Sequence, residues 1–266
     1  MKQNILVTGA SSGFGLLVAN ELHKKGYNVI GTSRNPEKMR SVVPFKMIAL
    51  DLDSEQSINS LPERIFKEIA QLDILINNAG FLVSGIAEEI PIELGRKQFE
   101  TNFWGTIKVT NAVLPYFRKQ KSGKIITVGS IVGLVSFPNA AYYAASKHAL
   151  EGYFKSLRYE LNEFKISVAM IEPSAFKTNI LDNSTSPLTK IEDYNSLRGK
   201  IEKFTNDLVK NAEAPEKVAE KVLNVVQADK PKFRNIVGKG TSTLLNFQHF
   251  AYGILEKNVL KKLNSF

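Results

Sequence analysis

Two adjacent tyrosines and a nearby lysine are the residues of this sequence best suited to acid–base chemistry. They lie in the stretch "AAYYAASK", residues 140–147. Residues four apart share one face of a helix, which pairs Tyr143 with Lys147, whereas Tyr142 is five residues away. A tyrosine is too basic to ionise readily near neutral pH, and a neighbouring positive charge favours its phenolate. Tyr143 is therefore the predicted acid/base, although two tyrosines on a helix could also serve only for packing.

A glycine-rich turn near the start of the chain predicts a nucleotide site. The stretch "VTGASSGFG" places Gly9, Gly13 and Gly15 where a first strand passes into a first helix. Glycines there let the backbone approach a phosphate, and the helix N-terminus offers free N–H groups. The spacing is not G-x-G-x-x-G, and the G-K-[ST] ending of nucleoside triphosphatases is missing. A dinucleotide is favoured, and a plain strand-to-helix connection is the alternative.

The end of the second predicted strand favours NADP over NAD. An acidic residue there would bind the adenosine ribose and repel a 2′-phosphate. The sequence instead reads "GTSRNPEK", with Ser33 and Arg34 and no carboxylate at the strand end. Arginine binds phosphate through a planar fork of donors, so Arg34 and Ser33 are candidates to hold that phosphate. The alternative is an ordinary surface arginine.

The elements that position these residues alternate between strands and helices. Strands are predicted at residues 4–9, 27–33, 45–52, 72–80, 123–130, 166–174 and 233–238. Helices are predicted at residues 15–26, 54–69 with Ser54 as N-cap, 95–120, 140–164 and 214–227, with one or two more at 242–263. This order predicts an α/β fold, a doubly wound Rossmann-type parallel sheet with helices on both faces.

The whole chain, residues 1–266, is predicted to be one dinucleotide-binding and catalytic domain. Residues 179–211 are polar and mixed, and a segment of that length without a strand is typical of a substrate lid. Residues 240–266 read as a C-terminal helical extension, apolar on one side and basic at its end. Such a helix suits a membrane surface, but packing on its own core or on another subunit is the commoner outcome.

Composition excludes several classes of protein. The chain is 43% hydrophobic and 23% charged, carries a net charge of +9 and has no cysteine. Disulfides, thiolate metal sites and a cysteine nucleophile are thereby excluded, and no metal site is predicted. The basic residues are spread along the chain without a recognition-helix or zinc-finger pattern, so no nucleic-acid partner is expected. The start has no secretory layout and no apolar run is long enough to span a bilayer, so a cytoplasmic protein is expected.

Five short motifs in order make the sequence resemble the short-chain dehydrogenase/reductase family along nearly all its length. They are T-G-x-x-x-G-x-G at 8–15, "NNAG" at 77–80, the asparagine of "TNFWG" at Asn102, the serine of "VGSIVG" at Ser130, and Y-x-x-x-K at Tyr143 and Lys147. Within the family the chain looks most like the NADP-preferring members related to hydroxysteroid and retinol dehydrogenases. One departure is Ser174, in "PSAFKT", where the family commonly has glycine.

The resemblance implies a set of catalytic and cofactor-binding residues. Ser130 ends the fifth strand, where ligands bind in open α/β sheets, and would hold the substrate oxygen. Lys147 would bind the nicotinamide ribose, and Asn102 would hold a water that links Lys147 to solvent. The predicted cofactor site comprises Thr8, Gly9, Ser11, Ser12, Gly13, Phe14, Gly15, Ser33, Arg34, Asp51, Leu52, Asn78, Ala79, Gly80, Tyr143, Lys147, Pro173, Ser174, Phe176 and Thr178.

The predicted activity is NADP(H)-dependent hydride transfer to or from an apolar ketone, aldehyde or secondary alcohol. The apolar character of the substrate is inferred from the predicted pocket wall, which comprises Phe81, Val83, Ile131, Leu134, Val135, Phe137, Tyr142 and Phe176. The alternatives are an NADP-binding sensor without catalysis and a membrane-surface protein.

The resemblance also implies a homodimer or homotetramer through the helices around 95–120 and 141–163. The candidate anchors are Trp104, Val109, Leu114, Phe154 and Leu157.

Overall fold

A single parallel sheet organises the protein, and its strands confirm the predicted Rossmann-type fold. The computed structural model describes residues 2–177 and 184–265. In this described part, seven parallel strands have the order β3-β2-β1-β4-β5-β6-β7. Their bounds are β1 Asn4–Val7, β2 Asn28–Ser33, β3 Lys46–Ala49, β4 Ile74–Asn77, β5 Gly123–Val128, β6 Ile166–Pro173 and β7 Arg234–Val237. The chain crosses from β3 on one side of β1 to β4 on the other, so the strand order reverses between β1 and β4.

Helices cover both faces of the sheet and bury two apolar layers. The first layer contains residues of α1 (Gly13–Lys24) and α8 (Glu216–Gln227), which pack against the sheet. The second contains residues of α2 (Glu55–Asn59), α3 (Leu61–Phe66), α5 (Thr106–Gln120) and α6 (Ala141–Glu160). The strands are buried on both faces, which explains why they read as continuous apolar runs rather than alternating ones.

Two predicted helices are interrupted. The helix expected at 54–69 is capped at Ser54, whose side chain accepts from Ser57 N at 3.2 Å, but it divides at Ser60 just before Pro62. Proline tolerates only the first turn of a helix, so α3 starts afresh there. The helix expected at 95–120 begins earlier, as α4 (Ile92–Phe99), and passes through a π-helical turn, η3 (Glu100–Gly105), before α5.

The described part of the predicted lid, residues 184–211, contains a long helix. This helix is α7 (Asn195–Lys210), preceded by the short 3-10 turn η6 (Glu192–Tyr194). Its buried residues Ile201 and Phe204 pack with Ile86 and Leu263. Residues 179–183 of the same prediction lie outside the described residues.

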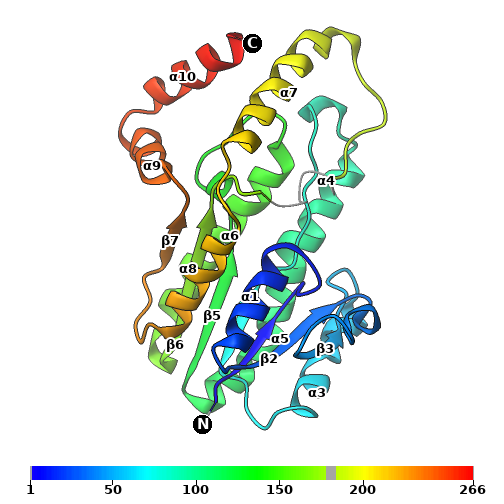
Figure 1. Cartoon of the computed structure of the whole chain (residues 1–266), viewed down its shortest axis with the longest axis vertical. Helices are drawn as coiled ribbons and strands as arrows, with labels where there is room; N and C mark the ends of the chain where they lie inside the picture. Colours follow the sequence, from blue (N-terminus) through cyan, green and yellow to red (C-terminus); the bar gives the residue numbers. More distant parts are fainter. Residues whose placement is uncertain (1, 178–183, 266) are drawn as a thin grey trace.

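The predicted C-terminal extension forms two helices, α9 (Thr241–Phe250) and α10 (Tyr252–Asn264). Leu255 of α10 packs on Ile131 and Val135, in the turn that follows β5. Lys262 of α10 pairs with Asp207 of α7, and α7 and α10 lie together at one end of the molecule (Figure 1).

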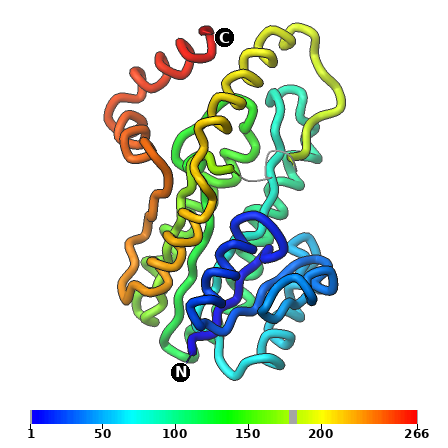
Figure 2. Tube along the Cα trace, in the orientation of Figure 1, coloured from blue at the N-terminus to red at the C-terminus, as the bar shows by residue number. Residues whose placement is uncertain are grey.

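The tube view places the N-terminal and C-terminal ends at opposite ends of the long axis (Figure 2). None of the helices in the described part is long and apolar enough to cross a membrane.

Three of the candidate interface anchors were predicted wrongly. Val109 and Phe154 are fully buried and Leu157 is 6% exposed, all in the layer between the sheet and α5 and α6. Their apolar character is therefore explained by the sheet itself. Trp104, in η3, is different because 49% of its surface is exposed.

Phe117 provides a test of this apolar layer. Its side chain is fully buried on α5, so Phe117→Ala should lower the free energy of unfolding by about 3–5 kcal/mol. Phe250→Ala is the matched control, because Phe250 is 81% exposed and should change stability by no more than about 0.5 kcal/mol. Urea denaturation followed by circular dichroism measures both. Equal effects would contradict the assignment of Phe117 to the core.

Candidate active site

The predicted catalytic residues gather at the carboxyl ends of β4, β5 and β6. This edge, beside the point where strand order reverses, is where open α/β sheets bind ligands. Ser130 follows β5, and Tyr143 and Lys147 occupy the first two turns of α6. Asn102 lies in the π-helical turn η3, an irregularity that is frequent at functional sites.

Lys147 is buried and fixed against the end of β5. Its side chain is 7% exposed, and its Nζ donates to the carbonyl oxygen of Val128 at 2.9 Å. The same Nζ lies 5.7 Å from the centroid of the Tyr143 ring, as the four-residue spacing predicted. Burial lowers the pKa of Lys147 to about 8, and the charge of Glu172 works in the opposite direction.

The Tyr143 phenol holds its proton tightly in the protein alone. Burial raises its pKa to about 12, the Ser130 hydroxyl lowers it, and the nearby Glu172 carboxyl raises it. The expectation that Lys147 favours the phenolate is therefore outweighed by burial. A phenol with this pKa is a proton donor at neutral pH, which suits the protonation of a substrate oxygen.

Tyr142 has a different environment from its neighbour. Its ring packs on Gly95 of α4, where an added Cβ would lie 2.2 Å from the ring. Tyr142 therefore fills the space between α4 and α6 and is not a free pocket wall. Other predicted wall residues are also used in packing: Val83, Ile131 and Val135 are buried, and Phe176 meets the ring of Phe14 at 5.9 Å.

Ser130 is oriented mainly through its backbone. Its N–H donates to Glu172 Oε2 at 2.8 Å. Its hydroxyl accepts from Val132 N at 3.3 Å and lies 3.5 Å from the carbonyl oxygen of Pro173. The hydroxyl is also close enough to Tyr143 to affect its pKa. Ser130, Tyr143 and Lys147 thus form one group.

The Asn102 side chain holds the loop after β4, and in the described residues no hydrogen bond joins it to Ser130, Tyr143 or Lys147. Its amide Oδ1 accepts from Phe81 N at 3.0 Å and its Nδ2 donates to Phe81 O at 2.9 Å. Gln98, which the sequence analysis missed, binds the same loop: it accepts from Val83 N at 2.7 Å and donates to Phe81 O at 2.6 Å. Both amides are buried, so their role in the described structure is to hold this loop.

The glycine turn has the backbone that its sequence predicted. Gly9 and Gly13 adopt φ values of +66° and +53°, in the left-handed region that favours glycine. An added Cβ on Gly15 would lie 2.3 Å from both Gly9 O and Asn78 Nδ2. Asn78 Nδ2 donates to Thr8 O at 2.9 Å, and Thr8 Oγ1 accepts from Asn78 N at 2.9 Å. Asn78 therefore shapes the turn, a role beyond the cofactor contact that was predicted.

Ser33 and Arg34 lie at the end of β2 and fit a phosphate ligand. Within the described residues, the Ser33 hydroxyl oxygen is buried and has no hydrogen-bond partner. Arg34 is exposed beside it. A buried polar atom without a partner normally has a ligand or water to satisfy it, so this position is compatible with a bound nucleotide.

The remaining predicted cofactor residues line the same edge or support it. Asp51 and Leu52 follow β3, and Asp51 N donates to Ser57 Oγ at 3.0 Å. Pro173 ends β6, and Ser174 N donates to Val237 O at 2.9 Å. Ser11, Ser12, Phe14, Ala79 and Gly80 lie in or beside the glycine turn and the loop after β4, and Thr178 lies outside the described residues.

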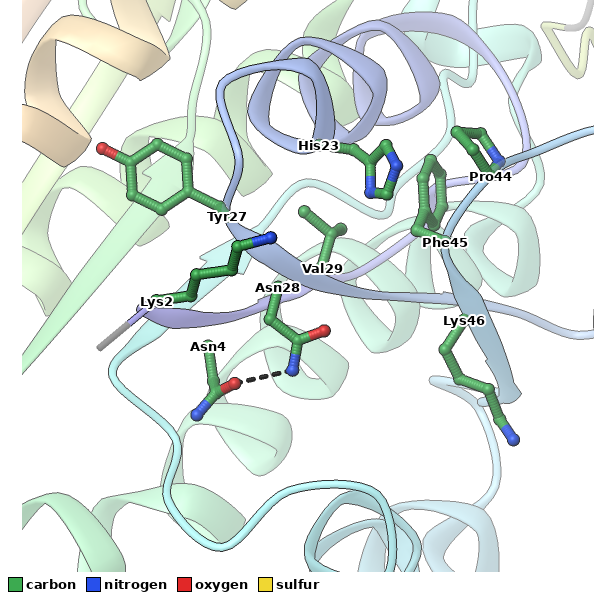
Figure 3. Close-up of a pocket in the computed structure, with 9 residues that line it drawn as sticks. All are labelled: Lys2, Asn4, His23, Tyr27, Asn28, Val29, Pro44, Phe45 and Lys46. Carbon is green, nitrogen blue, oxygen red and sulfur yellow. Dashed lines mark hydrogen bonds between the residues drawn. The ribbon is translucent and has the colours of Figure 1, made fainter.

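A distinct hollow of about 360 Å³ lies at the opposite edge of the sheet (Figure 3). It is lined by Lys2, Asn4, His23, Tyr27, Asn28, Val29, Pro44, Phe45 and Lys46. These residues are at or near the amino ends of β1, β2 and β3, and Asn28 Nδ2 donates to Asn4 Oδ1 at 2.7 Å within it. None of the predicted site residues contributes to this hollow, so the catalytic group and not the hollow identifies the candidate site.

Gly15→Ala tests the glycine turn. The new methyl group would meet the Gly9 carbonyl, so we expect nucleotide affinity to fall at least about tenfold, equivalent to about 1.4 kcal/mol. Gly152→Ala is the control, because a Cβ at Gly152 on α6 meets nothing within 4 Å. Titration of NADPH fluorescence measures both dissociation constants. Unchanged affinity in Gly15→Ala would show that the turn does not contact the nucleotide.

Comparison with known proteins places this geometry in a family. The sequence pattern of the family described as short chain dehydrogenase matches residues 3–188. The chain is 40% identical to the uncharacterized oxidoreductase YusZ of Bacillus subtilis, over 99% of both chains. It is 38% identical to a 3-ketodihydrosphingosine reductase of Bacteroides thetaiotaomicron, over 89% of this chain and 88% of that one.

Solved structures agree with the sequence relatives. A short-chain dehydrogenase from Streptomyces avermitilis superposes with a TM-score of 0.85 at 29% identity, over 100% of this chain and 98% of that one. ElxO with NADP bound superposes with a TM-score of 0.77 at 27% identity, over 91% and 100% of the two chains. The chain therefore belongs to the short-chain dehydrogenase/reductase family and is a nicotinamide-nucleotide-dependent dehydrogenase/reductase acting on C=O or CH–OH groups.

Proposed function

We propose that this protein is an NADP(H)-dependent reductase of an apolar ketone or aldehyde, with Tyr143 as the acid/base. The observation that carries the proposal is the grouping of Tyr143, Ser130 and Lys147 at the carboxyl edge of the sheet. The bound nucleotide would supply the hydride. Tyr143 gives its proton to the substrate oxygen, and Ser130 holds that oxygen through its hydroxyl.

Lys147 and Asn102 support proton supply to Tyr143. Below its pKa of about 8, Lys147 carries a positive charge. Near neutral pH this charge stabilises the Tyr143 phenolate that forms when the phenol gives up its proton. Its match to the family motif supports a second role for Lys147, binding of the nicotinamide ribose. Asn102, whose side chain fixes the loop at Phe81, would hold the water that links Lys147 to solvent, a role supported by its match to the family motif.

An apolar substrate is supported by the elements that surround Ser130. The turn after it, Ile131–Gly133, is covered by Leu255 of α10, and Phe137 packs near Phe204 of α7 with ring centroids 6.3 Å apart. We propose that residues 179–211 form a lid over the substrate and that α10 supports it. The 38% identical relative is named as the reductase of a keto compound, which favours a ketone.

The family often forms oligomers, and association into a dimer or tetramer stays a prediction for this chain. With Val109, Phe154 and Leu157 facing the sheet, Trp104 is the candidate anchor that remains exposed. A two-fold contact would use each such residue twice.

The two tyrosines provide the test of the proposed chemistry. Tyr143→Phe should reduce kcat by about 10²-fold or more, because the phenol proton is lost, while NADPH binding persists. Tyr142→Phe should retain most activity, since its ring packs on Gly95. Steady-state assays of NADPH oxidation with a panel of ketones and aldehydes measure both. Equal losses in the two variants would refute the assignment of Tyr143.

Arg34 tests the choice of nucleotide. A charge-assisted hydrogen bond to phosphate contributes about 1.5–3 kcal/mol, so Arg34→Ala should weaken NADPH binding about ten- to a hundredfold and leave NADH binding unchanged. Arg40→Ala is the matched control, since Arg40 is an exposed arginine nearby that pairs with Glu37. Isothermal titration calorimetry measures the NADPH and NADH affinities of the wild type and of both variants. Wild-type protein that binds NADH as tightly as NADPH would show that NADP is not preferred.

A further inference from the structure

A glutamate lies buried directly behind Ser130. Glu172 is 1% exposed and is the ionisable residue within the otherwise uncharged strand β6, "ISVAMIEP". Its Oε2 accepts from Ser130 N at 2.8 Å. Gly129 leaves room for this carboxyl, because an added Cβ there would lie 2.6 Å from Oε2. A carboxylate in such a place is costly unless it is paired or neutral.

No positive side chain in the described residues forms an ion pair with Glu172. The nearby amine, Lys147 Nζ, is bonded instead to Val128 O. The Glu172 carboxyl lies within hydrogen-bonding reach of a second buried carboxyl, that of Glu151. Glu151 is on α6, four residues after Lys147 and on the same face, and it pairs with Arg234 of β7.

Two oxygen atoms of this carboxyl pair lack partners. Glu172 Oε1 and Glu151 Oε2 are both buried without a hydrogen-bond partner in the described part of the chain. Two carboxylates in contact cannot both ionise cheaply, and one proton between them satisfies both orphaned atoms at once. In agreement, burial and the Glu151 carboxyl raise the pKa of Glu172 well above its usual range. Arg234 stabilises the remaining negative charge on Glu151.

We infer that Glu172 and Glu151 share one proton and that this pair is a positioning element, which holds the Ser130 backbone and thereby fixes the place of its hydroxyl. The inference rests on the proposed role of Ser130 in catalysis. The groups that face the pair are Tyr143 and Lys147 from α6, Ser130 after β5 and Arg234 from β7.

The shared proton also matters for the electrostatics of the site. A charged Glu172 raises the pKa of both Tyr143 and Lys147, which would hinder ionisation of the phenol. Because folding raises the pKa of Glu172, the stability that its protonated form contributes is present at low pH and is lost as pH rises through the raised pKa. That loss begins above the carboxyl pKa of the unfolded chain, so holding the proton in the folded pair costs stability near neutral pH.

The protonation state can be read without any turnover. Infrared difference spectroscopy of the whole protein at neutral pH should show the C=O stretch of a buried, protonated carboxylic acid. Glu172→Gln should abolish this band, whereas the control Glu220→Gln, an exposed glutamate on α8, should retain it. Absence of the band in wild-type protein at neutral pH would overturn the inference, even if Tyr143 proves to be the acid/base.

Kinetics test the positioning role. Glu172→Leu leaves Ser130 N without its acceptor and should lower kcat about tenfold or more with unchanged NADPH affinity. Glu172→Gln should recover most of that loss, because its amide oxygen accepts from Ser130 N and its NH₂ group donates to Glu151. A Gln variant as impaired as the Leu variant would mean that Glu172 acts as a charge and would refute the shared proton. If the Leu variant does not fold, Gly129→Ala, which displaces the carboxyl, replaces it, and unchanged kcat there would refute the positioning role.

Discussion

The hydrogen bond from Lys147 Nζ to the carbonyl oxygen of Val128 fixes α6 against the end of β5, and the candidate active site depends on it. Tyr143, Lys147 and Glu151 follow one another at four-residue intervals along the same face of α6. A single rigid helix thus sets the distances among the proton donor, the amine and the buried carboxyl. The end of β5 and its neighbour β6 supply the rest, Ser130 and Glu172, so the site is a contact between one helix and two adjacent strands.

The glycine turn, at the same carboxyl edge of the sheet, is also held in place by hydrogen bonds. Asn78 donates two hydrogen bonds to Thr8 across the junction of β1 and β4, which ties the glycine turn to the loop after β4. Asn102 and Gln98 then hold the next part of that loop at Phe81. The side chains of Asn78, Asn102 and Gln98, which look suited to ligand contact, are thus hydrogen-bonded to the protein backbone. The Ser33 hydroxyl is different, because in the described chain it has no protein partner.

The sequence predicted features that depend on local spacing and on apolar pattern. The alternation of strands and helices, the pairing of Tyr143 with Lys147 and the Ser54 cap all belong to this class. Interruptions at Ser60 and in η3 were not predicted, since an apolar period continues through them while the backbone does not. The faces of Val109 and Phe154 were also misassigned, because an amphipathic pattern alone does not say how wide a stripe the sheet covers. A charged residue inside the apolar run of β6 was the available signal for Glu172, but its partner Glu151 becomes evident only when α6 is docked.

The covering of the Ser130 turn by α10 has a consequence for how this protein could diverge from its relatives. The family pattern ends at residue 188, whereas α7, α9 and α10 lie beyond it. Leu255 and Leu263 bring this C-terminal part of the chain into contact with the turn after β5 and with α7. Mutations in these helices would change the packing around the turn after Ser130 without disturbing the glycine turn or the strand ends. Under the proposed function, such changes would alter which molecule the site accepts and leave the residues that move the proton in place.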